Sequence, residues 1–384
     1  MTAAPTTSSR RESVKDFLAT EAASGTVLVL LAVVALIWAN GPAAEEYESL
    51  FATQLGPLDL HAWVNDGLMA LFFLVVGLEI KRELTVGELQ DRRAAALPAV
   101  AALGGMVVPA MLFLVLAGDG SRRGWGAPMA TDIAFALGVI GLLGTRVPSG
   151  ARLFLLTLAI VDDLGAIAVI AVVYSGTIHL AWLAGAAAAV IGVAILGGRW
   201  WALVCLGPVA WWCTHESGVH ATIAGVVLGL VIPVSRGEGY EHRLHPYTSF
   251  VVVPIFALAN AGVVLSGALD APGAGQLAFA IGAALVVGKL VGVAGATWLA
   301  LRLRVGVLPD GMGAGHVAGI AAIAGIGFTV SLFVVDLAYL RAPTLAAGAK
   351  IGVLAASITA AALGAALLYR VREAETTPEA GVEA

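Results

Sequence analysis

Two adjacent aspartates, Asp162 and Asp163, lie near the middle of an apolar run from Leu153 to Val173. A run of this length is about long enough to cross a bilayer as a helix. Each carboxylate at the centre of such a span costs roughly 2.5–3.5 kcal/mol by insertion scales. Because helix packing does not require that cost twice in succession, the pair indicates a site that handles cations or protons.

A third acidic residue, Asp132, lies in another apolar run, within the stretch Pro128-Met129-Ala130-Thr131-Asp132. Proline lacks an amide proton and disfavours helix in the residue before it. Thr131 and Asp132 are residue types that cap helix N-termini well. The stretch therefore predicts a helix break and a new helix start, where a carboxylate would compensate the free amides and the positive end of the helix dipole.

A second interrupted span is predicted around Ala324-Gly325-Ile326-Gly327-Phe328-Thr329. Interrupted helices in corresponding places of two halves are typical of inverted repeats with an ion site between them. The C-terminal ends of two half-helices would then point inward with partial negative charge. Lys289, in the middle of an apolar run, is the one deep cation of the sequence that is available to balance them.

Neighbouring residues on a helix point about 100° apart, so Asp162 and Asp163 cannot both face one point. We expect one carboxylate to face the ion cavity and the other to pair elsewhere, for example with Lys289. A single aspartate inside a span can be a packing group bonded to a Ser or Thr. Two adjacent aspartates together with Asp132 and Lys289 make a purely structural explanation poor.

The whole chain has the composition of an all-α polytopic membrane protein. Of its 384 residues 59% are hydrophobic and 12% are charged, whereas soluble domains carry about 25% charged residues. An outer-membrane barrel would show alternating segments of about ten residues instead. Cys205 and Cys213 are too few for a disulfide framework. About twelve spans of bilayer length are predicted, at 24–40, 63–81, 95–117, 126–144, 153–174, 179–197, 201–216, 218–234, 247–267, 276–299, 317–340 and 348–369.

The connections between these spans are short, so we predict a single membrane transport domain over 24–370. A cytoplasmic N-terminal segment over 1–23 and a cytoplasmic tail over 371–384 would flank it. With the N-terminus inside, most of the 21 Lys and Arg residues fall on the cytoplasmic side, as positively charged loops do. Those predicted outside are Arg122, Arg123, Arg341 and Lys350.

Several stretches of the sequence closely resemble signatures of the NhaA family of bacterial Na⁺/H⁺ antiporters, in the same order from about residue 16 to 370. This family is itself an established example of inverted repeats with broken helices. The matching stretches are GLEIKREL (77–84), ATDIAFALG (130–138), AIVDDLGA (159–166), LHP (244–246), FALANAG (256–262) and GIGFT (325–329).

The resemblance implies a fold with inverted repeats and twelve helices, of which the fourth and the eleventh are discontinuous and cross near the bilayer midplane. It implies a multi-pass protein of the bacterial inner (plasma) membrane and a homodimer, with the loop over 41–61 forming a β-hairpin at the contact. It also implies export of Na⁺ or Li⁺ in exchange for H⁺, two protons for each Na⁺, so that transport is electrogenic. The family serves Na⁺ and pH homeostasis. No cofactor is expected besides these transported ions.

The same resemblance assigns roles to individual residues. Asp162 and Asp163 would bind the transported cation and the protons, with Asp163 the more indispensable. Thr131, Asp132 and Lys289 would support them. The residues that match positions of the pH response near the cytoplasmic entrance are Glu79, Arg82, Glu83, Glu241, His242 and His245.

Two features depart from the family pattern. The loop Gly237-Glu238-Gly239-Tyr240 is less basic than in characterised relatives, which bears on the pH set-point. Asp336 lies in a stretch that we expect to be apolar in relatives, and the sequence offers no account of it.

Other functions are compatible with parts of the sequence. A Na⁺-coupled solute symporter would also need buried aspartates, and Lys289 could then bind a substrate carboxylate. An intramembrane aspartyl protease would need carboxylates on two facing helices and a Gly-x-Gly-Asp motif, which the sequence lacks. His215-Glu216 and His220 are one residue too far apart for a zinc-binding His-Glu-x-x-His motif, so His220 is predicted to be a polar packing residue.

Overall fold

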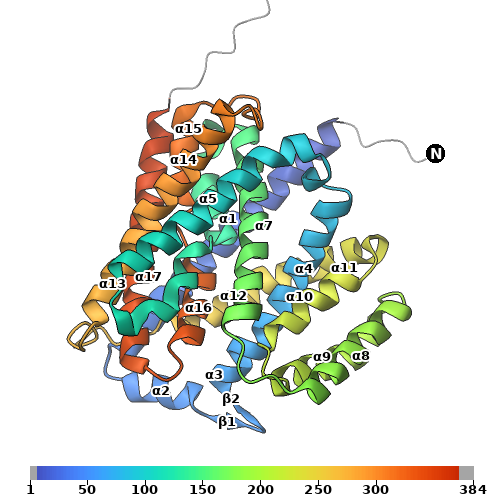
Figure 1. Ribbon diagram of the computed structural model, residues 1–384, viewed down its shortest axis with the longest axis vertical. Coiled ribbons are helices and arrows are strands. Elements are labelled where there is room, and N and C mark those ends of the chain that lie inside the picture. The colour runs from blue at the N-terminus through green and yellow to red at the C-terminus, as the bar shows by residue number, and fades with distance from the viewer. Residues whose placement is uncertain (1–6, 372–384) are drawn as a thin grey trace, which may run out of the picture.

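The computed structural model describes residues 7–371, and these are mostly helical (Figure 1). The first six residues and nearly all of the predicted tail lie outside the described residues. The elements of the first half are α1 (Thr7–Ala39), α2 (Ala44–Phe51), β1 (Gln54–Leu55), β2 (Leu58–Asp59), α3 (Leu60–Ala62), the π-helical turn η1 (Trp63–Leu68), α4 (Met69–Thr85), η2 (Glu88–Gln90), α5 (Arg92–Leu116), η3 (Asp119–Met129), α6 (Ile133–Leu143), η4 (Gly144–Arg146) and α7 (Ser149–Val173).

The second half of the chain continues in the same way, with two further π-helical turns, η5 and η6. Its elements are α8 (Leu180–Ile195), α9 (Trp200–Glu216), α10 (Thr222–Val231), α11 (Val234–Tyr247), η5 (Thr248–Val252), α12 (Val253–Asn260), α13 (Ala274–Ala283), η6 (Ala284–Gly288), α14 (Lys289–Arg302), α15 (Ala314–Ile323), α16 (Phe328–Ala338) and α17 (Pro343–Arg370).

The predicted all-α membrane architecture is confirmed. Among the described residues, five helical runs are each long and apolar enough to cross a bilayer: Leu60–Thr85, Arg93–Leu116, Ser149–Val173, Ala274–Arg302 and Pro343–Arg370. The fourth and eleventh spans are broken, as predicted. Helix η3 meets α6 at an angle of 52°, and α15 meets α16 at 43°. Each of the other predicted spans also falls on a helix.

The predicted boundaries of the ninth span, 247–267, are wrong. Helix continues through α11, η5 and α12 from Val234 to Asn260, and residues 261–273 form turns instead. Hydropathy misplaces the start because the first half of this helix is polar. A salt bridge of 3.2 Å between Arg82 and Glu241 holds that polar half against α4. Just beyond the end of this helix, Gly262 packs against the ring of Tyr47, where a side chain would have no room.

The first predicted span and the loop that follows it contain more regular structure than the sequence indicates. Helix α1 begins at Thr7, well inside the segment predicted to precede the membrane domain. The loop over 41–61 contains α2 and the antiparallel pair β1–β2, with Leu55 opposite Leu58. The hairpin that the family resemblance implies is therefore present. Its role in a dimer contact stays a prediction.

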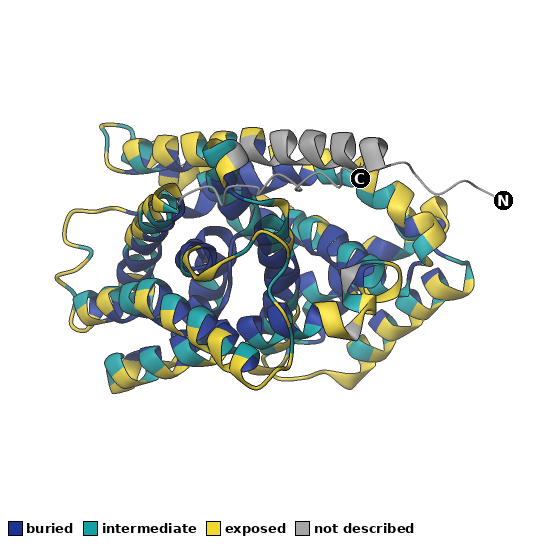
Figure 2. Cartoon of the chain, turned by 90° about the horizontal axis from the view of Figure 1, so that it is seen from above, coloured by how far each residue is buried: buried dark blue, intermediate teal, exposed yellow. Residues whose placement is uncertain are grey.

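Glycine lets several helices approach closely inside the bundle, whose interior is buried (Figure 2). A side chain at Gly104 of α5 would collide with the backbone carbonyl of Gly292 of α14, and a side chain at Gly292 would collide with that of Gly104. Gly225 of α10 lies in the same way against the carbonyl of Ala70 of α4. Small residues therefore let these membrane helices pack closely at the crossings.

The bundle has two distinct ends, which serve as references below. We call the end that carries α2 and β1–β2 the hairpin end (bottom of Figure 1). We call the opposite end, where α4 stops at Thr85 and α7 begins at Ser149, the basic end. The predicted orientation places the basic end in the cytoplasm and the hairpin end outside.

Candidate functional site

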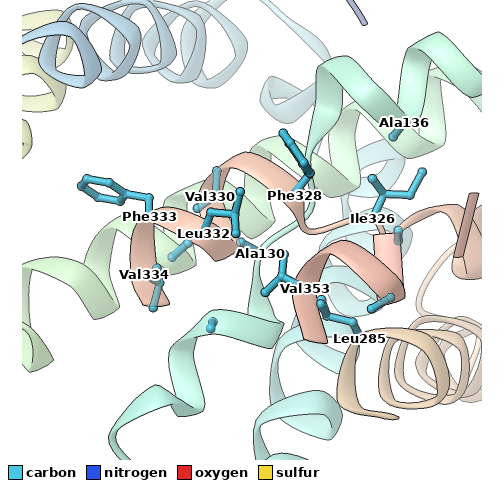
Figure 3. Packing of buried hydrophobic residues seen from close by; sticks show 14 of the residues in the cluster. Ala130, Ala136, Leu285, Ile326, Phe328, Val330, Leu332, Phe333, Val334 and Val353 are labelled. Carbon is cyan, nitrogen blue, oxygen red and sulfur yellow. The ribbon is translucent and has the colours of Figure 1, made fainter. Parts of the chain in front are cut away.

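The breaks in the fourth and eleventh spans lie against each other at the centre of the bundle. The backbone amide of Asp132 donates to the carbonyl of Ile326 over 2.6 Å. Side chains from both breaks, Ala130 and Ile326 among them, belong to one buried apolar cluster (Figure 3). Four half-helices thus end or begin at one point, which leaves uncapped backbone groups of both signs in an apolar interior.

Asp132 caps two of these half-helices at once. Its Oδ1 accepts from the amide of Phe135 in the first turn of α6, over 3.0 Å. Its Oδ2 accepts from the amide of Thr329, over 3.0 Å, and from the Thr329 hydroxyl, over 2.7 Å, at the start of α16. One negative charge therefore faces the positive ends of two helix dipoles. The sequence predicts the cap on α6, whereas the second cap was not foreseen.

Lys289 supplies the positive charge on the opposite side of the crossing. Its side chain is fully buried directly after the π-helical turn η6. The ammonium donates to the carbonyl of Met129, the last residue of η3, and lies 3.1 Å from the Thr131 hydroxyl. It also lies 2.5 Å from Asp162 Oδ2. Lys289 thus balances one half-helix C-terminus, as predicted, and one of the two adjacent aspartates.

The adjacent carboxylates point in different directions, as helix geometry requires. Asp162 is fully buried, and its Oδ2 contacts Lys289 and accepts a hydrogen bond of 2.6 Å from Thr131. Its Oδ1 has no hydrogen-bond partner among the described residues. The sequence left open which aspartate pairs with Lys289, and in the structure it is Asp162.

Asp163 instead faces a cavity of about 70 Å³. No hydrogen bond or ion pair from the described part of the chain engages its carboxylate. A cavity of this size can hold water or a small cation, since one water needs only about 10–15 Å³. The remaining lining residues are Phe72, Val75, Val76, Glu79, Thr131, Asp132, Ile133, Ala134, Leu156, His245, Thr248, Ser249, Val253, Thr329 and Val330.

The cavity extends from the crossing toward the basic end, where most of the predicted pH-response residues gather. Glu79 and His245 lie in its wall. One turn further along α4, Arg82 bridges Glu83, over 3.1 Å, and Glu241, over 3.2 Å. These five residues therefore form one group between α4 and α11.

Two further observations refine this group. Burial raises the pKa of Glu241, although the nearby Arg82 guanidinium opposes that shift. His242, in contrast, has an exposed side chain and does not line the cavity. The structure thus gathers five of the six predicted residues.

A cluster of titratable residues at the hairpin end escaped the sequence analysis. Asp66 Oδ1 lies 3.5 Å from His220 Nε2, and Asp66 Oδ2 lies 3.6 Å from His215 Nδ1. The two histidines contact a carboxylate on another helix, which their spacing along the chain could not reveal. No group of three or more such side chains in the described residues is arranged to hold a metal ion.

The chain was compared with known proteins. Residues 15–368 match the family model described as Na⁺/H⁺ antiporter 1. A protein of Mesorhizobium japonicum named Na⁺/H⁺ antiporter NhaA is 46% identical over 387 residues, which cover 96% of each chain. Relatives of the same name from Acidovorax sp. and Yersinia enterocolitica are 48% and 44% identical. These matches cover 93% and 92% of this chain, and 92% and 96% of the relatives.

The family match spans nearly the whole described structure, including both broken spans and the aspartate pair. Identity is far above the level at which membership is in doubt, and coverage is nearly complete in both directions. The chain therefore belongs to the Na⁺/H⁺ antiporter 1 family.

Proposed function

We propose that this protein exports Na⁺ or Li⁺ in exchange for H⁺, and that Asp163 is the carboxylate that binds either the cation or a proton. Relatives that are named Na⁺/H⁺ antiporters match this chain over nearly their full length. The observation that carries the site assignment is the position of Asp163, whose carboxylate no described residue pairs, in a small cavity at the crossing of two broken helices.

Na⁺ and Li⁺ are hard cations and prefer oxygen ligands. Asp163 offers an anionic oxygen, and Thr131, Asp132 and Thr329 line the same cavity. Because the same carboxylate also binds protons, cation and proton compete for it. Exchange follows when the loaded site alternates its access between the two ends of the bundle.

We further propose that two protons enter for each Na⁺ that leaves. One net charge then crosses per cycle, so that about 2.3 kcal/mol per 100 mV of membrane potential drives export. The second proton has two candidate carriers, Asp162 and Lys289, and these lie 2.5 Å apart in one ion pair. The carriers are thus coupled, because protonation of Asp162 removes the charge that holds Lys289.

The same proposal includes the protein's setting and regulation. The protein lies in the bacterial inner membrane as a homodimer, with both termini in the cytoplasm. The positive-inside distribution of Lys and Arg supports that orientation. The group formed by Glu79, Arg82, Glu83, Glu241 and His245 tunes the pH response from the cytoplasmic entrance, and export supports Na⁺ and pH homeostasis.

The geometry argues against the alternative of a solute symporter. The cavity of about 70 Å³ leaves little room for an organic substrate. Lys289, which would have to grip a substrate carboxylate, is already engaged by Asp162, Thr131 and the carbonyl of Met129. Addition of Na⁺ alone to the purified protein should therefore release protons.

Replacement of Asp163 tests the proposal. Asp163→Asn should abolish Na⁺-dependent proton flux in everted vesicles while the protein still inserts, and Asp310→Asn, at an exposed position, should leave the flux unchanged. The flux of the unmodified protein should be low at pH 6 and rise toward pH 9, because protons outcompete the cation at acid pH. Normal flux in Asp163→Asn would exclude the site assignment.

A further inference from the structure

Asp336, which neither the sequence nor the proposed site explains, forms an ion pair at the hairpin end. Its Oδ1 lies 2.7 Å from Lys350 Nζ, at the start of α17. Its Oδ2 lies 3.4 Å from the side-chain amide of Asn65 in η1. Both charged side chains are mostly buried, at 12% and 13% exposed. Charges in such positions are costly even when they pair with each other, and they often mark functional sites.

Two asparagines, which hydrogen-bond to each other, lie next to this ion pair. Asn260 Nδ2 donates to Asn65 Oδ1 over 2.8 Å, and Asn65 Nδ2 lies 3.4 Å from Asn260 Oδ1. We call Asn65, Asn260, Asp336 and Lys350 the hairpin-end latch. It joins η1, α12 and the consecutive helices α16 and α17 at one point.

An aromatic layer lies between this latch and the ion cavity. Phe333 of α16 is fully buried, with its ring 5.8 Å from that of Phe73 and 6.3 Å from that of Phe256. Figure 3 shows Phe333 on α16, beyond Val330 and away from the break at Ile326. None of these three rings lines the cavity, so they lie beyond its wall, toward the latch.

The cavity wall, the aromatic layer and the latch follow one another in the same order along α16 and along α12. On α16, Thr329 lines the cavity, Phe333 lies one turn further, and Asp336 belongs to the latch. Seven residues make nearly two full turns, so Thr329 and Asp336 share one face about 10 Å apart. On α12, Val253 lines the cavity and Phe256 and Asn260 follow.

The third helix, formed by η1 and α4, runs in the opposite direction and has the matching order. Val76 lines the cavity, Phe73 contacts Phe333, and Asn65 reaches the latch. We propose that the hairpin-end latch and the Phe333 layer form the gate that closes the ion site from the outside, and that the Asp336–Lys350 pair must separate for the cation to leave. This proposal rests on the proposed function for the exchange and for the side that is outside.

The contact between Asn65 and Asp336 suits a gate better than a permanent clamp. Asn65 Nδ2 has three acceptors at 3.4 Å, on His61, Asn260 and Asp336, but only two protons to donate. Hydrogen bonds of that length are weak. The caps made by Asp132 at the crossing are shorter, at 2.7–3.0 Å. The Asp336–Lys350 pair, at 2.7 Å, and the hydrogen bond from Asn260 to Asn65, at 2.8 Å, are as short as these caps, so the loose part of the latch is the contact between Asn65 and Asp336.

Accessibility of the cavity from each face tests the gate directly. In a Cys205→Ser/Cys213→Ala background, Val330→Cys places a thiol in the cavity wall. A membrane-impermeant thiol reagent is then applied to right-side-out and to everted vesicles. Adding Asp336→Asn should speed labelling in right-side-out vesicles about fivefold, as a small coupling free energy allows, and slow it in everted ones.

The matched control is Asp270→Asn, an exposed acid on the loop before α13, which should leave both labelling rates unchanged. The charge swap Asp336→Lys/Lys350→Asp should restore slow labelling. If Asp336→Asn fails to accumulate in the membrane, the labelling rate of the swapped protein is measured instead. Unchanged labelling in Asp336→Asn, or fast labelling in the swapped protein, overturns the gate. Faster labelling in everted vesicles overturns the predicted orientation instead, and loss of exchange by the unmodified protein bears on the proposed function alone.

Discussion

Replacement of Asp132 by asparagine should destabilise the protein through two helices at once. The amide side chain would keep one oxygen for the backbone amide of Phe135 but would turn an NH₂ group toward the backbone amide of Thr329. The lost charge-assisted hydrogen bond contributes about 1.5–3 kcal/mol. The lost charge near each helix N-terminus adds about 0.3–1 kcal/mol. We therefore expect the free energy of unfolding to fall by about 3 kcal/mol, estimated from these contributions.

Unfolding of the purified protein by SDS in mixed micelles, followed by far-ultraviolet circular dichroism, measures this loss. Asp310→Asn is the control, because exposed substitutions usually change stability by less than about 0.5 kcal/mol. Thr329→Val removes the second donor, so its effect and that of Asp132→Asn should be strongly non-additive. A loss below about 0.5 kcal/mol for Asp132→Asn, or simple additivity with Thr329→Val, would refute the double-cap argument.

Other contacts of the structure lead to three further predictions. Lys289→Met should cost about 3–5 kcal/mol of unfolding free energy, because it strands the buried charge of Asp162; the double variant with Asp162→Leu should recover much of it in the same SDS titration. Gly292→Ala should lower both stability and exchange, because its side chain would collide with α5, whereas Gly295→Ala, which meets open space, should not. Glu241 has a raised pKa in the folded state, so between its ordinary and raised pKa the folded state binds the extra proton and stability falls as pH rises. Glu241→Gln should reduce this fall of stability with rising pH. An unchanged dependence of stability on pH in the variant would contradict this prediction.

The broken spans could be predicted because their causes are local. Pro128 and the capping residues Thr131 and Asp132 stand close to one another in the sequence, and the structure breaks there. Gly325 and Gly327 mark the second break in the same way. The divergence of the adjacent aspartates also followed from one helical rotation.

The parts that could not be predicted depend on partners far away in the chain. Thr329, the second group capped by Asp132, is 197 residues distant. The choice of Asp162 as the partner of Lys289 depends on the rotation of α14 against α7, which no local pattern encodes. The hairpin over 54–59 has strands of only two residues, so the sequence pattern left an extended, a hairpin and an interfacial segment open, and the family resemblance indicated the hairpin.

The ninth span shows a different limit. Hydropathy identifies the part of a helix that lipid surrounds, but α11 is polar and is stabilised by its contact with α4. A helix of this kind has no signature in the average hydropathy. Asp336 is a similar case. Its partner Lys350 lies on the following helix, and the sequence alone does not show that the two side chains form an ion pair.

The distribution of charge at the crossing explains why the exchange would be obligatory. Asp162 is balanced by Lys289, and Asp132 by two helix N-termini. When Asp163 is ionised and the cavity holds no cation, its charge has no partner among the described residues. Movement of an uncompensated buried charge past the Phe333 layer would cost several kcal/mol. A bound cation or a proton removes that cost, so the site can change sides when loaded with either but not when empty.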